Sequence, residues 1–228
     1  MVYSFSKYIK TSIGKKQVVA TTGLVLVLFV IGHLAGNLIM FLGPDAFNTY
    51  AGKLAGLRPW LYIVECGLLG VFIIHLWITA LLVIENYSAR PVGYAVRKSV
   101  GKRSLATRLM PYTGTVIFAF VIWHLIDFTF ADKEGPLSVL ADGRSYGLYG
   151  VVYNAFSDPI HSALYIIAMM AVGFHLSHGI QSFIQTFGFN HPDYTPMIQK
   201  ASNSLAVLIT LAFSSIPVYV LVKNALAS

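Results

Sequence analysis

Charged side chains are scarce in this sequence. Of its 228 residues only 11% are Asp, Glu, Lys or Arg, against about 25% in ordinary soluble domains. These charges crowd into short stretches, separated by apolar runs of roughly twenty residues. The mean hydropathy of +0.69 therefore reflects distinct segments, and the sequence predicts an integral membrane protein in place of a soluble domain.

Cysteine is nearly absent as well. The single cysteine, Cys66, lies inside an apolar run, which excludes a disulfide framework, a CxxC redox pair and a CxxCH site for covalent haem attachment. The net charge of +7 does not indicate a nucleic-acid partner, because the basic residues flank apolar segments and form no common surface.

Five apolar stretches are each long enough to cross about 30 Å of hydrocarbon. The sequence therefore predicts an all-α membrane protein with one domain, residues 1–228, of five transmembrane helices. The first stretch is about twice as long as a signal-peptide core and lacks an A-x-A-like cleavage site, so it is expected to remain as a helix. The expected helices span residues 18–42, 60–84, 112–130, 160–187 and 205–222.

Basic residues are distributed unequally between the two sides of this arrangement. One side carries eleven, at Lys7, Lys10, Lys15, Lys16, Arg90, Arg97, Lys98, Lys102, Arg103, Arg108 and Lys200. The other side carries five, at Lys53, Arg58, Lys133, Arg144 and Lys223. The positive-inside rule then predicts a cytoplasmic N-terminus and an external C-terminus. Two longer loops, 43–59 and 131–159, fall on the outer side, and the first contains AFNTYAGKLAG, which is expected to form a short interfacial helix.

Five of the seven histidines lie well within the expected spans. A titratable ring in hydrocarbon is costly and is a functional candidate, although a single one can simply hydrogen-bond a neighbouring helix. Here four helices each contribute at least one and the fifth contributes none, which is typical of a site in the core of a bundle. The five are His33, His75, His124, His175 and His178.

An internal repeat relates the first two spans to the next two. TGLVLVLFVIGHL, ending at Leu34, matches TGTVIFAFVIWHL, ending at Leu125, with the same Thr-Gly ten residues ahead of the histidine. FIIHL around His75 likewise resembles VGFHL around His175. Leucine follows each of the four matched histidines, whereas Gly179 follows His178. The repeat therefore favours His175 as the ligand on the fourth helix.

Depth in the membrane groups the four histidines into pairs. At about 1.5 Å per residue, His33 and His124 lie roughly 20–25 Å from the cytoplasmic ends of their helices, and His75 and His175 roughly 15 Å. Two imidazoles from facing helices are suitable axial ligands for haem iron, and such ligation leaves no open position for substrate. We therefore expect two b haems for electron transfer, with His178 contacting a ligand or a haem propionate.

A di-iron or zinc site does not fit the pattern of these histidines. A di-iron carboxylate site needs Glu-x-x-His pairs, which do not occur in this sequence. A zinc site needs its ligands at one depth, whereas these histidines fall at two. Glycines near the histidines would let a flat macrocycle approach the backbone, but small-residue helix packing explains each of them equally well. They are Gly32, Gly36, Gly67, Gly70, Gly173 and Gly179.

The motifs IGHLAGN, GPDAFNTYAGKL, IIHLW, VIWHL and FHLSHGIQSF together resemble the cytochrome b membrane-anchor subunit of succinate:quinone oxidoreductases. The similarity is to the five-helix, two-haem form of bacterial succinate dehydrogenases and fumarate reductases, and it extends over nearly the whole chain. It implies that His33 and His124 hold the distal haem and that His75 and His175 hold the proximal haem.

The resemblance also implies partners and a location. It indicates the bacterial inner membrane, menaquinone as the exchangeable substrate, and an iron–sulfur subunit and an FAD flavoprotein on the cytoplasmic face. The sequence has no flavin or Fe–S motif, so the chain alone is not expected to interconvert succinate and fumarate. Some two-haem fumarate reductases carry a glutamate two residues before the fourth-helix ligand, whereas this chain has Gly173 there.

A quinol delivers protons with its electrons, so its site needs a protonatable group near a haem edge. Four candidates fall at the depth of the outer haem: Asn37, Glu65, Asp127 and His161. Interfacial charges and a helix contact would explain them equally well. Glu65 and Asp127 are the preferred pair. On the inner side the bases Lys16, Arg108 and Lys200 are suited to haem propionates, although topology alone accounts for them.

The basic loop 90–108 has six bases and no acid, and we expect it to dock the soluble subunits, with lipid headgroups as the alternative partner. Two other functions were considered: the cytochrome b of a membrane hydrogenase or formate dehydrogenase, and a small transporter. A transporter needs broken helices, whereas the histidine-bearing spans contain no internal proline and only Pro217 is expected to break the fifth.

Overall fold

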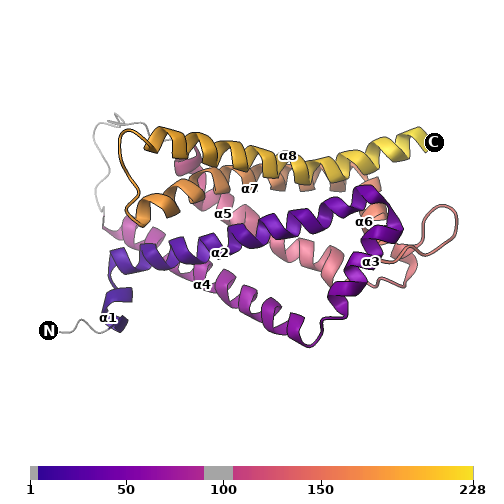
Figure 1. The fold of residues 1–228 in the computed structure, drawn as a ribbon, viewed down its shortest axis with the longest axis horizontal. Coiled ribbons are helices and arrows are strands. Elements are labelled where there is room, and N and C mark those ends of the chain that lie inside the picture. The colour runs from indigo at the N-terminus through magenta and orange to yellow at the C-terminus, as the bar shows by residue number, and fades with distance from the viewer. Residues whose placement is uncertain (1–4, 90–104, 228) are drawn as a thin grey trace.

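The long helices run along the length of the molecule (Figure 1). The computed structural model describes residues 5–89 and 105–227. Within these residues the elements are α1 (Phe5–Ile9), α2 (Ser12–Leu38), η1 (Ile39–Leu42), α3 (Pro44–Ala55), α4 (Trp60–Ser88), α5 (Leu105–His124), η2 (Leu125–Thr129), η3 (Pro136–Ser138), α6 (Gly147–Ser157), α7 (Pro159–Thr186) and α8 (Thr195–Ala227).

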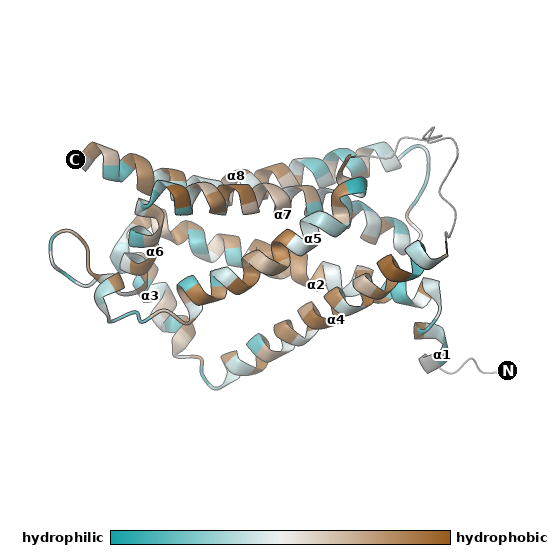
Figure 2. Cartoon of the chain, turned by 180° about the vertical axis from the view of Figure 1, so that it is seen from behind, coloured by the Kyte–Doolittle hydropathy of each residue, from teal (hydrophilic) through white to brown (hydrophobic). Residues whose placement is uncertain are grey.

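The prediction of an all-α membrane protein is confirmed. In the described part of the chain, five helical segments are long and apolar enough to span a membrane: α2 with η1, α4, α5 with η2, α7 and α8. Figure 2 shows that apolar residues cover most of their length. Apolar runs predict the membrane-buried part of a helix, and the polar turns that extend beyond it explain why most of these helices are longer than expected.

Two expectations about proline were wrong. Because α5 begins seven residues before the expected start, Pro111 lies inside a histidine-bearing helix. Pro217 does not break the last helix either, since α8 continues through it to Ala227. Each proline removes one backbone hydrogen bond, a loss that membrane helices tolerate when neighbouring helices and polar side chains support the backbone.

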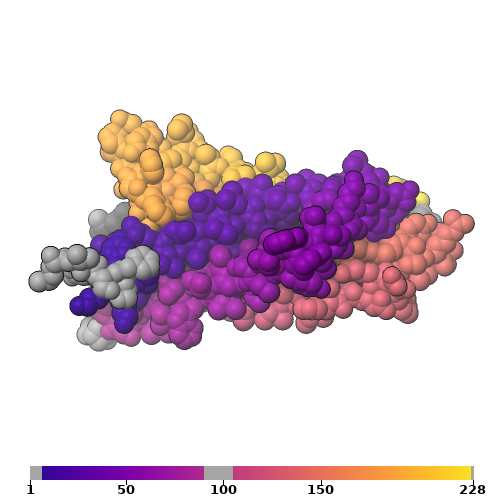
Figure 3. Space-filling model, turned by 60° about the horizontal axis from the view of Figure 1, so that its bottom comes forward, coloured from indigo at the N-terminus to yellow at the C-terminus, as the bar shows by residue number. Residues whose placement is uncertain are grey.

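The packing order places α2 centrally. It contacts α4, α7 and α8, and α7 in turn packs against α5 and α8. Figure 3 shows α2 running along one face of the molecule, with α3 folded back against one of its ends. Leu34, Leu176, Ala206 and Ile209 form a buried cluster between α2, α7 and α8. The histidine-free helix α8 thus supports the two helices next to it.

Gly173 lies at a close contact between α7 and α8. A Cβ atom at this position would collide with Thr210 Oγ1 on α8. Gly36 serves the same purpose between α2 and α3, where a Cβ would meet the ring and hydroxyl of Tyr50. Helix packing therefore accounts for these two glycines.

Two short helices, α3 and α6, lie together at one end of the bundle, which we call the outer end in keeping with the predicted topology (Figure 1). The short helix expected in loop 43–59 is confirmed as α3, whereas α6 was not foreseen. Asn48 on α3 joins them: its Nδ2 donates to the carbonyl oxygen of Tyr146 at 2.7 Å, and its Oδ1 accepts from the amide of Tyr149 at 3.1 Å. Both helices contribute to a buried core formed by Met40, Phe47, Tyr149, Val152, Phe156, Tyr165, Ile216 and Val220.

Candidate functional site

The imidazoles of His33 and His124, here called the outer pair, face each other across the bundle. Their ring centroids are 5.7 Å apart and their planes are nearly perpendicular, at 89°. Phe29 stacks on His33 at 5.4 Å, and Phe120 and Phe128 pack against His124 at 5.6 and 5.3 Å. Two imidazoles at this separation in an apolar surrounding fit the axial ligation of a haem.

His75 on α4 and His175 on α7, here called the inner pair, each have a threonine partner on another helix. Thr22 Oγ1 on α2 lies 3.0 Å from His75 Nδ1, and Thr113 Oγ1 on α5 lies 3.1 Å from His175 Nδ1. The two inner histidines thus have equivalent threonine contacts on two different helices.

Glycines adjacent to these threonines make room for the imidazoles. A Cβ at Gly23 would lie 3.3 Å from His75 Cε1, and one at Gly114 would lie 3.5 Å from His175 Cε1. The sequence displayed this Thr-Gly repeat, but it was interpreted only as a sign of duplication. Its structural role, which is to contact the histidine of the following long helix, was missed.

His178 lies one helical turn from His175 and is half-buried. Its Nδ1 is 3.0 Å from Thr107 Oγ1 on α5, so a third hydroxyl–imidazole contact continues the series toward the inner end. A Cβ at Gly179 would meet no atom within 4 Å, and the same holds for Gly32, Gly67 and Gly70. Open space beside these four glycines is compatible with a macrocycle lying against the backbone.

Asp127 belongs to a polar cluster immediately beyond His124. It lies on η2, a π-helical turn that continues α5, and such turns often occur at functional sites. Its Oδ2 accepts a hydrogen bond of 2.6 Å from the hydroxyl of Tyr165 and lies 3.3 Å from His161 Nε2. The Tyr165 ring also lies 6.2 Å from that of His124, between centroids, so the cluster adjoins the outer pair.

Tyr165 is a residue that the sequence analysis missed. It is only 5% exposed and stacks on His161 with centroids 4.8 Å apart. Tyrosine is common in apolar helices, and nothing in its sequence context distinguished this one. Its contact with an acid on another helix becomes visible only in the folded bundle.

The other two quinone candidates have different partners. Glu65 Oε1 lies 3.4 Å from Arg58 Nη2, and its side chain is 48% exposed. Asn37 Nδ2 donates to the carbonyl oxygen of His33 at 2.8 Å. Among the described residues, no hydrogen bond or ion pair joins either side chain to Asp127. The structure thus brings Asp127 together with His161, but not with Glu65.

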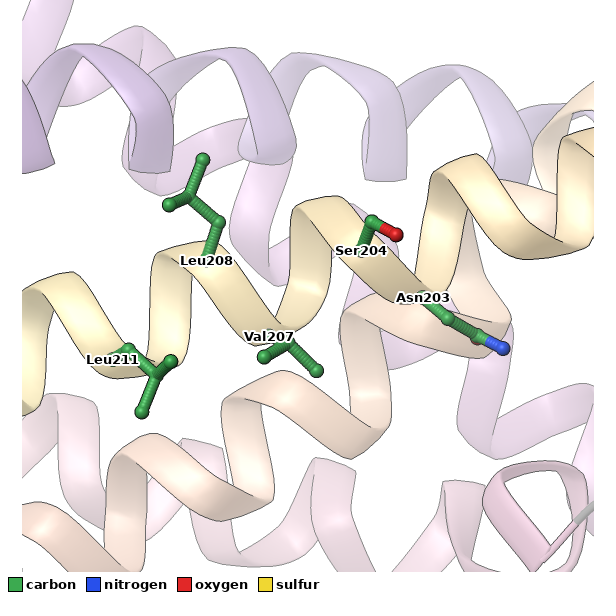
Figure 4. A pocket seen from close by; sticks show the side chains of 5 residues that line it. All are labelled: Asn203, Ser204, Val207, Leu208 and Leu211. Carbon is green, nitrogen blue, oxygen red and sulfur yellow. The ribbon is translucent and has the colours of Figure 1, made fainter.

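Most of the basic loop expected to dock soluble subunits lies outside the described residues. This applies to Arg90, Arg97, Lys98, Lys102 and Arg103. The shallow hollow of Figure 4 is on α8 and is lined by Asn203, Ser204, Val207, Leu208 and Leu211. It contains none of the histidines and therefore does not contribute to the paired arrangement.

Comparisons with known proteins indicate the family of this chain. Residues 97–216 match the family model described as succinate dehydrogenase/fumarate reductase transmembrane subunit. The chain is 27% identical over 191 residues to the succinate dehydrogenase cytochrome b558 subunit of Bacillus subtilis (strain 168), covering 82% of this chain and 84% of that protein. No solved structure matches significantly. Since the family model covers more than half of the sequence, this chain belongs to the family of succinate dehydrogenase/fumarate reductase transmembrane subunits.

Proposed function

We propose that this chain passes electrons between a quinone at its outer end and soluble succinate-oxidising or fumarate-reducing subunits through two b haems. The observation that carries the proposal is the apposition of two intramembrane histidines from different helices, His33 and His124. His75 and His175, on two further helices, have matching threonine contacts. When held by two histidines, haem b carries single electrons and has no open position for substrate.

The residues around each pair orient the imidazoles and exclude water. Phe29, Phe120 and Phe128 surround the outer pair. The inner pair is held by the hydroxyls of Thr22 and Thr113. In the proposed assignment, His33 and His124 would hold the outer haem, and His75 and His175 would hold the inner haem.

The cluster of Asp127, Tyr165 and His161 is the proposed site of proton exchange with a quinol, with menaquinol as the expected species. A quinol releases two protons together with two electrons, and a carboxylate beside the outer pair is suited to accept a proton. His161 is the third residue of α7, so the cluster reaches the outer end of this helix. Water at the membrane surface lies in that direction.

The proposed partners are an iron–sulfur subunit and an FAD flavoprotein on the cytoplasmic side of a bacterial inner membrane. The similar Bacillus subtilis protein is named as a subunit of succinate dehydrogenase, which supports an assembly of this kind. The excess of basic residues on the N-terminal side supports a cytoplasmic N-terminus.

The test is the haem content of the purified chain. We expect a reduced-minus-oxidised spectrum with two b-type components and two haems per chain by pyridine haemochrome. His75→Ala and His175→Ala should remove one and the same component, and His33→Ala and His124→Ala the other, because loss of either axial ligand disrupts the site. His178→Ala should retain both.

Two results would contradict the proposal. Absence of haem bands from the folded wild-type chain would exclude electron transfer through b haems. Loss of a component in His178→Ala, with both retained in His175→Ala, would show that the ligand on α7 is assigned to the wrong residue.

A further inference from the structure

We propose that Thr22 and Thr113 are positioning residues, which fix the tautomer and orientation of His75 and His175 so that Nε2 of each inner imidazole is free to bind iron. The inference rests on the proposed function and goes beyond it by assigning a role to two residues that contact neither iron nor substrate. It starts from the two hydroxyl–imidazole distances of 3.0 and 3.1 Å.

The direction of these hydrogen bonds follows from the other contacts of each hydroxyl. Thr22 Oγ1 lies 2.7 Å from the carbonyl oxygen of Val18, and Thr113 Oγ1 lies 3.1 Å from that of Leu109. A hydroxyl has only one proton to donate. In the proposed arrangement the threonine proton goes to the carbonyl oxygen of its own helix, and the hydroxyl oxygen accepts from the imidazole. Nδ1 then carries the proton, and the lone pair is on Nε2.

The same arrangement occurs twice, in the two halves of the internal repeat. Thr22 precedes His33 by eleven residues, and Thr113 precedes His124 by eleven. Eleven residues make about three helical turns and a rise of roughly 16 Å. On α2, one face therefore carries His33 and, three turns away, the Thr22 hydroxyl that contacts His75 on α4. On α5, the equivalent face carries His124 and the Thr113 hydroxyl that contacts His175 on α7.

The outer pair differs in this respect. His124 Nδ1 is buried and has no hydrogen-bond partner among the described residues. Hydrogen bonds to the distal nitrogen of a histidine ligand fix the ring and raise its basicity, and losing such a partner typically weakens metal binding roughly 10–100-fold. The threonines should therefore act on the inner haem and leave the outer haem unaffected.

The experiment uses the haem-loaded chain with Thr22→Val and Thr113→Val, which replace each hydroxyl by a methyl group of similar size. Thr22→Ser and Thr113→Ser retain the hydroxyl. Thr21→Val and Thr115→Val are matched controls, because these threonines are exposed neighbours on the same two helices. Haem stoichiometry, the electron paramagnetic resonance signals of the ferric state and the midpoint potentials are measured for each variant.

In the valine variants we expect roughly 10–100-fold weaker retention of the inner haem. The affected spectral component is the one lost in His75→Ala. Its ferric signal should shift and its potential should rise, because a less basic ligand stabilises ferric iron less. A tenfold preferential loss of ferric over ferrous affinity corresponds to about 59 mV for one electron. The serine variants should resemble the wild type, and the outer component, which depends on His33 of the same α2, should remain.

An unchanged inner signal and potential in both valine variants would overturn the inference, as would a shift of the outer component instead. Equal loss of the inner and outer haem components, in the serine variants as much as in the valine variants, would assign the threonines a role in folding. This result would also overturn the inference. The proposed function fails separately, because its failure is seen as missing haem bands in the wild-type chain.

Discussion

Asp127 is a carboxylate in the outer half of the bundle with two partners on α7. The Tyr165 hydroxyl donates to it at 2.6 Å, and His161 lies 3.3 Å away. An acid in a membrane span is costly unless it is paired or serves a function. The π-helical turn after His124 brings this acid next to the outer pair, so we expect it to take part in proton exchange.

Replacing Asp127 by asparagine preserves its shape but removes the protonatable group. We expect Asp127→Asn to slow quinol-dependent fumarate reduction by about 10²–10⁴-fold, with the haem content unchanged. The assay is run on the assembled complex, together with fumarate reduction by an artificial dye that bypasses the membrane subunit and should not change. Asp132→Asn, at an exposed acid in the adjacent outer loop, is the matched control.

Glu65→Gln is assayed in parallel because Glu65 is the second acid predicted for this step. A strong loss in Glu65→Gln alone would assign the proton exchange to α4. Full quinol activity in both variants would exclude the outer site.

At the scale of elements, the contact between α7 and α8 shows why a helix without histidines matters to the site. Gly173 lies two residues before His175 and directly against Thr210. This close approach helps to set the position of α7, and hence of His175, relative to the rest of the bundle. A glutamate at this position, as in some two-haem fumarate reductases, would meet the Thr210 side chain on α8.

We therefore expect Gly173→Ala to destabilise the chain by about 1–3 kcal/mol through overpacking, and Gly173→Glu by more, since a charge is also buried. Thermal unfolding in detergent, followed by the loss of haem absorbance, measures the effect. Thr210→Ala removes the colliding atom and should restore much of the stability of Gly173→Ala. Gly52→Ala is the control, because a Cβ there would meet no atom within 4 Å; an equal loss in both alanine variants would contradict the packing argument.

At the scale of the whole molecule, the two ends of the bundle are built differently. The outer end is covered by α3 and α6, which are joined through Asn48 and lie over a buried core. The opposite end carries basic residues near the starts of α2, α5 and α8, at Lys15, Lys16, Arg108 and Lys200. This asymmetry favours the basic end as the docking surface for soluble subunits.

Charge reversal tests this assignment. Replacing Arg97, Lys98, Lys102 and Arg103 by glutamate should release the iron–sulfur and flavoprotein subunits from membranes while both haems remain. Co-purification with the tagged membrane subunit provides the measurement. Reversal of Lys133 and Arg144 on the outer side is the control and should not affect assembly. Unchanged co-purification of the four-residue variant would count against docking at the basic loop.

The sequence by itself determined the five spans and the histidines that four of them carry. The thickness of the hydrocarbon core sets the length of an apolar run, and the internal duplication marks equivalent histidines. Both signals are properties of the order of residues in the chain and require no contact between helices. The segment AFNTYAGKLAG also predicted α3, whereas α6, whose burial depends on contacts with other parts of the chain, was missed.

Only the tertiary structure decided which polar groups meet across helices. The contacts of Thr22 with His75 and of Tyr165 with Asp127 depend on the rotation and axial position of separate helices. Glu65, in contrast, has a local partner in Arg58, seven residues earlier and just before the start of the same helix. A sequence fixes the spacing of residues along each helix, whereas side-chain packing between helices fixes rotation and axial position.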